Sequence, residues 1–199
     1  MVANYYKPGP ATKPGEVSYR IANPSSRGDD DYGKWYVADN YMEGNVSVTA
    51  DNWNGGLQPS KQEFKLDQPW PAMAINQQAA EDAYQSVLEH AGATLPKRDM
   101  VDARIIEETR NGNATYEGIY KTKKTVADKS RICGIIDSQK DVGGWPELKS
   151  TTAPTDTDHD GMPDDWENKK GLDPNNADDR NKIAADGYTM LEKYLNSID

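Results

Sequence analysis

The chain has 199 residues, of which 35% are apolar, and a formal net charge of −10 at pH 7. This length suits one domain or one and a half, and the negative charge argues against nucleic acid as a partner. No apolar run approaches the roughly 18 residues that a membrane-spanning helix needs.

Residues 1–75 have the composition of short β-strands separated by turns. Strands of three or four residues at this spacing favour a parallel β-helix or an irregular sandwich. Asn40, Asn45 and Asn52 are candidates for stacking at the corners of successive coils, although exposed turn asparagines are the commoner explanation. The expected strands are Tyr5-Tyr6, Val17–Ile21, Trp35–Val37, Tyr41–Met42 and Val46–Thr49.

Residues 76–112 change to helical spacing. Apolar residues recur at helical intervals up to Leu88, and Gly92 is a plausible stop. A second helix is expected from Asp99 to about Arg110, with Met100, Val101, Ile105 and Ile106 facing inwards. The charges of Arg98, Asp99, Asp102 and Arg104 admit an active site, but surface ion pairing along the start of a helix is the favoured interpretation.

Residues 113–150 are expected to be mostly extended or irregular, with one candidate buried strand at Ile132–Ile136. It contains the only cysteine, Cys133, which is predicted to be a small core residue because no histidine near it in sequence would activate it. A single cysteine forms no internal disulfide, so cysteine usage does not indicate whether the protein works in an oxidising or a reducing compartment. The sequence does not begin with basic residues followed by an apolar stretch, which is the pattern expected of a signal peptide.

Residues 156–167 carry oxygen-bearing side chains at the spacing of an EF-hand loop. Ca²⁺ binds six to eight oxygens at about 2.3–2.6 Å, and a tightly curled loop delivers that many. Gly161 stands where such a loop turns sharply. An acidic, solvated linker is the alternative, but the residue order favours calcium. The expected ligands are Asp156, Asp158, Asp160, the backbone carbonyl of Met162, Asp164 directly or through water, and Glu167 through both oxygens.

A second, incomplete loop follows around Asp186-Gly187. Lys182 and Ala184 stand where its first two ligands belong, and Lys193 stands where its closing Glu belongs, so this loop is predicted to be degenerate. Zinc has little support, because the chain has two histidines and one cysteine and His159 is at a non-ligand position.

Two short helices are expected in this segment. One spans Trp166–Lys170, and the other runs from Met190 to about Ser197. Thr189 and Glu192 have the spacing of a capping box for the second helix. Its apolar stripe is expected to pack on Trp166.

Several sequence strings resemble bacterial pectate lyases over essentially the whole chain. Strings similar to the closing coils of those enzymes are Asn4–Thr12, Trp35–Asn45 and Val48–Trp53. Strings similar to their C-terminal extension are Ala80–Tyr84, Asp102–Ile106, Gly134–Ser138, Gly143–Pro146 and the calcium loop. The resemblance implies a secreted, calcium-dependent polysaccharide lyase that cleaves pectate or pectin, an acidic plant polysaccharide, by β-elimination.

The resemblance also implies the fold, which is mainly β with an α-helical C-terminal extension. Residues 1–75 are expected to form the last coils of a right-handed parallel β-helix, about three of them at roughly 25 residues each. Residues 76–150 are expected to wrap these coils as helices and extended arms, and residues 151–199 to form a calcium-loop helix pair. We expect a monomer that is secreted, periplasmic or on the cell surface.

In the pectate lyases the catalytic coils precede a segment like Asn4–Thr12, so this chain alone is expected to lack the catalytic arginine and to be inactive. Arg20 and Arg27 receive no catalytic role. The alternative is a non-catalytic, calcium-stabilised module that is carbohydrate-binding or dockerin-like. The aromatic residues available for stacking on sugars are Trp35, Tyr36, Trp53, Trp70 and Trp145, although filling a thin core is their favoured role.

Overall fold

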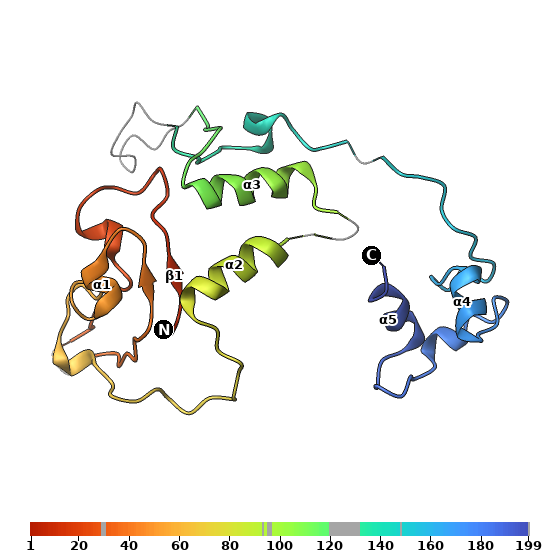
Figure 1. Cartoon of the computed structure of the whole chain (residues 1–199), viewed down its shortest axis with the longest axis horizontal. Helices are drawn as coiled ribbons and strands as arrows, with labels where there is room; N and C mark the ends of the chain where they lie inside the picture. The colour runs from red at the N-terminus through yellow and green to blue at the C-terminus, as the bar shows by residue number, and fades with distance from the viewer. Residues whose placement is uncertain (29–30, 93, 95–96, 120–131, 148, 199) are drawn as a thin grey trace. The chain divides into compact units, whose positions relative to one another are not determined.

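The computed structural model describes residues 1–28, 31–92, 94, 97–119, 132–147 and 149–198. The chain divides into two compact units, one of Met1–Gly92 with Asp99–Trp145 and one of Ala93–Arg98 with Pro146–Asp199. Residues on both sides of the expected boundary at 75 belong to the first unit. Figure 1 labels the main elements of both units. In the part of the chain that the structure describes, no helix has the length and apolar character needed to cross a membrane.

Parallel pairing between distant segments organises the first unit. Strand β1 (Tyr5–Tyr6) pairs in parallel with β2 (Tyr41–Met42). Residues paired in parallel lie 30 to 36 positions apart in the sequence, a longer separation than the roughly 25-residue coils expected. Parallel segments need such long return connections. The complete β-helix stays a prediction. Further isolated parallel bridges join Val2 to Ala38, Ala22 to Leu57 and Trp35 to Lys65.

Buried asparagines tie the paired segments together. Asn40, which is 1% exposed, accepts hydrogen bonds from the backbone and side-chain N–H groups of Asn4. The Asn52 side chain accepts from the Asn40 backbone N–H at 2.9 Å and donates to the carbonyls of Asn40 and Val48. Exposed turns are therefore the wrong explanation for Asn40 and Asn52. An apolar cluster forms the core beside them: Ile21, Val37, Met42, Val48 and Leu57.

Two segments expected as strands are helical. Helix α1 (Val46–Ala50) replaces the strand at Val46–Thr49, because the Asn45 side chain accepts a hydrogen bond from the Val48 N–H. This N-cap outweighs the weak preference of valine and threonine for strands. The 3-10 helix η1 (Glu16–Tyr19) replaces most of the strand at Val17–Ile21. Asn45 is thus a helix cap and does not belong to the hydrogen-bonded group of Asn4, Asn40 and Asn52, which we call the asparagine stack.

The first unit also contains two short 3-10 helices, η2 (Gln62–Phe64) and η3 (Gln139–Val142). The segment Ile132–Ile136 has no strand assignment, so the predicted buried strand is wrong. Cys133 alone is buried there, at 3% exposure, which confirms its place in the core.

Helices α2 (Ala80–His90) and α3 (Met100–Asn111) confirm the two predicted helices. Asp99 begins α3 by accepting hydrogen bonds from two backbone N–H groups of its first turn. Asp99 therefore acts as a helix cap, a role different from the surface ion pairing expected for this charged segment. Met100 and Ile105 are 74% and 46% exposed, so the prediction that both face inwards is wrong.

A stack of three tyrosines joins α2 to the paired strands. Helix α2 lies beside β1 (Figure 1), and the Tyr84 ring stacks on Tyr5 with 4.2 Å between centroids. Tyr5 stacks in turn on Tyr41 at 4.8 Å. The Glu43 carboxylate completes the group by accepting from Tyr5 Oη at 2.7 Å and from Lys7 Nζ at 2.7 Å. The stack therefore combines ring contact with charge.

Protonation of Glu43 at acid pH is expected to lower the stability of the first unit. Partial burial raises the pKa of Glu43, but hydrogen bonds from Lys7 and Tyr5 outweigh this and lower it below its usual 4.5. A lowered folded-state pKa gives stability that is present above the unfolded pKa and is lost as the pH falls through the folded pKa. Solvent screens the pair, since Glu43 is 37% exposed, and the effect is at most about 1 kcal/mol.

The test compares thermal unfolding of wild type and Glu43→Gln between about pH 3 and pH 7. The variant is expected to be less stable near neutral pH and equal to wild type at the acid end. The exposed Glu63→Gln serves as control. A Glu43→Gln deficit that persists unchanged in acid would contradict the ion-pair explanation.

The second unit contains helices α4 (Asp164–Lys170) and α5 (Met190–Leu195) and the 3-10 helix η4 (Asp179–Asn181). Trp166 of α4 meets Tyr194 of α5 edge to face, with centroids 5.4 Å apart. This contact confirms the predicted packing on Trp166 for Tyr194, whereas Leu195 and Ile198 of the same apolar stripe are 55% and 40% exposed. Thr189 and Glu192 form the predicted capping box.

Candidate metal centre

The predicted calcium loop brings three aspartates together. One carboxylate oxygen from each of Asp156, Asp158 and Asp160 lies within 4.8 Å of the other two. Gly161 has a φ of 97°, which supplies the sharp turn that the loop pattern requires. His159 is exposed, in keeping with its predicted non-ligand position.

Asp160 also belongs to a second group of carboxylates, which is completely buried. One oxygen each of Asp160, Glu167 and Asp179 lie within 4.8 Å of one another. These residues are 2%, 0% and 1% exposed. The two groups adjoin because they share Asp160. Sequence analysis missed Asp179, which lies in η4 outside the loop spacing. Its local sequence signal is weak, an Asp178-Asp179 pair after a turn.

Several oxygens of these groups are buried without a hydrogen-bond donor. They are Asp158 Oδ2, Asp160 Oδ2, Glu167 Oε1, Glu167 Oε2 and Asp179 Oδ1. An unpaired buried polar atom costs about 1–3 kcal/mol, and more when it is charged. A hard cation bound beside these carboxylates would give such oxygens a positively charged partner. The atoms available to bind a metal in these two groups are all carboxylate oxygens, as Ca²⁺ prefers, and no thiolate or imidazole is among them.

The electrostatics of the site agree with this fit. Burial, together with the charges of Asp158 and Asp160, raises the pKa of Glu167 to about 7. Burial also raises the pKa of Asp160. Both shifts show that negative charge is crowded and poorly solvated here. A divalent cation would oppose both effects.

Asp164 and Met162 differ from the other expected ligands. Asp164 Oδ1 accepts from the Thr157 backbone N–H at 2.8 Å, and Asp164 Oδ2 accepts from Thr157 Oγ1 at 2.7 Å. These bonds lower the pKa of Asp164 and close the loop. Met162 is completely buried. Coordination by the Met162 carbonyl and by Asp164 stays a prediction.

The second half-loop carries its own positive charge. Lys193 Nζ lies 2.6 Å from Asp186 Oδ2. The lysine stands where a complete loop has its closing Glu, and its ammonium group neutralises Asp186, the acidic residue at the fifth loop position. This pairing explains how the loop keeps a turn, with Ala184 N–H bonded to the Tyr188 carbonyl at 2.8 Å, without the usual ligand set.

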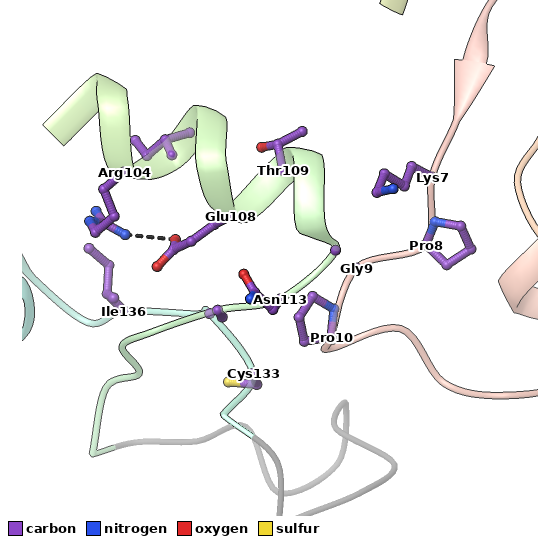
Figure 2. A pocket seen from close by; sticks show the side chains of 14 residues that line it. Lys7, Pro8, Gly9, Pro10, Arg104, Glu108, Thr109, Asn113, Cys133 and Ile136 are labelled. Carbon is purple, nitrogen blue, oxygen red and sulfur yellow. Dashed lines mark hydrogen bonds and ion pairs between the residues drawn. The ribbon is translucent and has the colours of Figure 1, made fainter. Parts of the chain in front are cut away.

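The first unit contains a pocket of about 420 Å³ between the segment that begins at Lys7, helix α3 and the segment that contains Cys133. Figure 2 shows its side chains. Arg104 is paired there with Glu108 at 2.8 Å (Figure 2). Lys7 is paired with Glu43. Both basic side chains are therefore neutralised, and the pocket offers an anionic sugar little net attraction.

The tryptophans considered for sugar stacking are divided between core and surface. Trp35 and Trp53 pack against the apolar core, and Trp53 Nε1 donates to the Val37 carbonyl at 3.1 Å. Trp70 and Trp145 are 69% and 80% exposed. The core-filling role is thus confirmed for Trp35 and Trp53.

The chain is similar to fungal proteins of one name. It is 30% identical over 205 residues to "Probable pectate lyase C" of Aspergillus flavus, a match that covers 100% of this chain and 41% of the relative. The chain resembles pectate lyases along its whole length. Proteins of the same name match from Aspergillus oryzae (32% identical, 82% of this chain and 35% of the relative) and Emericella nidulans (29% identical, 98% and 41%).

These similarities support a pectate-lyase-like family for the chain. No family model matches it. The relatives are fungal, so the bacterial character of the predicted resemblance is not shown. The chain spans about two fifths of the length of the curated relatives from Aspergillus flavus and Emericella nidulans.

Proposed function

We propose that this chain is part of a pectate-lyase-like polysaccharide lyase that acts on acidic plant polysaccharide outside the cell. The observation that carries the proposal is similarity to proteins named probable pectate lyase along the whole chain. In β-elimination a base removes the C5 proton of a uronate, the C4–O4 bond breaks, and a C4–C5 double bond forms in the product. We assign no residue of this chain to that step.

Within this protein, residues 151–199 are proposed to form a calcium-stabilised structural module. The adjoining carboxylate groups with buried, unpartnered oxygens support this role. When bound, Ca²⁺ supplies positive charge that offsets the repulsion between these carboxylates. Asp156, Asp158, Asp160 and Glu167 would hold it.

The functional test is incubation of the purified chain with polygalacturonate, with absorbance of the unsaturated product as the readout. The pectate lyases that the chain resembles carry their catalytic arginine in an arginine-rich motif, and no arginine of this sequence has that context. We therefore expect no product from these 199 residues alone. Arg20, which receives no catalytic role, donates a hydrogen bond from Nε to Gln58 Oε1 at 2.6 Å. Product formation would show that the catalytic machinery is present.

A second candidate function is non-catalytic carbohydrate binding, which the exposure of Trp70 and Trp145 favours. Affinity electrophoresis in pectin gels separates this candidate from the first, because a binding module is retarded there. The dockerin-like alternative is disfavoured, because it needs two complete calcium loops and the Lys193–Asp186 pair occupies the second.

A further inference from the structure

Only one of the two carboxylate oxygens of Asp179 accepts a hydrogen bond from the protein. Its Oδ2 accepts a hydrogen bond from the Asp173 backbone N–H at 2.9 Å and lies 3.4 Å from Lys182 Nζ. Its Oδ1 is buried and accepts no hydrogen bond. One oxygen of Asp179 lies within 4.8 Å of oxygens of Asp160 and Glu167. The side chain is therefore held in place by one oxygen, while the other has no donor.

We propose that Asp179 is a direct ligand of the ion that the loop binds, so that a single Ca²⁺ joins the loop to η4. The inference rests on the proposed calcium site and adds to it a ligand from outside the EF-hand pattern. Helix η4 thereby contributes a calcium ligand, although its sequence has no calcium-binding pattern.

The supply of oxygens supports this assignment. An EF-hand often completes its shell with a water held by the ninth-position residue. The ninth-position residue here is Asp164, and both of its carboxylate oxygens are bonded to Thr157. Asp179 can supply the oxygen that this arrangement lacks. The three loop aspartates, both oxygens of Glu167, the Met162 carbonyl and Asp179 together fall within the six to eight oxygens that Ca²⁺ takes.

A second contact fixes η4 against the loop. Arg180, the residue after Asp179, donates from Nη1 to the Asp160 backbone carbonyl at 3.2 Å. Two adjacent residues of η4 thus approach the same loop residue, one at its backbone and one at its side chain. Arg180 also brings a positive charge near the carboxylates, which lowers the cost of adding Asp179 to them.

Calorimetric titration of the full chain with CaCl₂ tests the assignment. Asp179→Asn removes the charge with little change of shape and is expected to weaken calcium binding by about 10- to 100-fold, because ligand charge sets affinity in such sites. Asp178→Asn is the matched control. Asp178 is the exposed neighbour, and its side chain makes no capping bond to η4. It should bind calcium as wild type does.

Amide hydrogen exchange of the wild-type chain gives a readout that needs no variant. If Asp179 binds the ion, calcium slows exchange in 172–183 as well as in 156–167. Protection confined to 156–167, or unchanged affinity in Asp179→Asn alongside a large loss in Glu167→Gln, would overturn this inference and leave the proposed calcium site intact. No calcium binding by the wild-type chain would remove both.

Discussion

Glu167→Gln is expected to change the stability of the second unit in opposite directions with and without calcium. With free Ca²⁺ at about 100 times its Kd, binding adds about 2.7 kcal/mol, and the variant should lose most of it because one charge and one ligand oxygen disappear. Without calcium the variant should be more stable than wild type by on the order of 1 kcal/mol, because it removes a buried charge from a crowded group. A reversal of this kind separates a metal ligand from an ordinary buried acid.

Thermal unfolding in excess calcium and in a chelator measures both arms. Asp165→Asn is the matched control, since Asp165 lies in the same helix, loses the same charge and is exposed. It should show no reversal. If Glu167→Gln destabilises the unit equally in both conditions, Glu167 is a structural acid and the calcium assignment is wrong.

The core of this site was predictable because an EF-hand loop is a local pattern. Asp156, Asp158 and Asp160 reach one point through the turn at Gly161, which needs only the sequence between them. Asp179 obeys no such spacing. Its approach depends on how the chain returns after α4, and Arg180 and the Asp173 backbone fix that return. Tertiary contacts of this kind have no fixed spacing in the sequence, so the sequence pattern does not predict them.

The fold shows the same division between local and distant causes. Helix α3 was predicted from local signals, and its ends are set by neighbouring residues, Asp99 as N-cap and Gly112 as C-cap. The strand predicted at Val46–Thr49 failed, because one Asn45 hydrogen bond changes the local backbone more than residue preference does. The tyrosine stack escaped prediction altogether, since Tyr84 is remote in sequence from both Tyr5 and Tyr41.

Asn40→Ala is expected to destabilise the first unit by about 1–3 kcal/mol. The substitution removes the acceptor for two N–H groups of Asn4 and the donor for the Met1 and Ala38 carbonyls. It also removes the side-chain donor to Asn52 Oδ1. The Met1 and Ala38 carbonyls keep backbone N–H donors, and Asn52 Oδ1 still accepts from the Asn40 backbone N–H. The loss is therefore that of one buried, hydrogen-bonded side chain, about 1–3 kcal/mol, because alanine replaces none of its bonds.

Amide hydrogen exchange measured by mass spectrometry locates the effect of this substitution. Exchange should accelerate in Asn40→Ala around β1 and β2, where Asn40 joins parallel segments, while calcium-dependent protection of 156–167 should stay unchanged because it belongs to the other unit. Asn54→Ala provides the control, since Asn54 is exposed and its backbone N–H bond to the Asp51 carbonyl does not depend on the side chain. Equal exchange in Asn40→Ala and Asn54→Ala would mean that the asparagine stack contributes little. The pairing of β1 with β2 would then depend on the apolar core and the tyrosine stack alone.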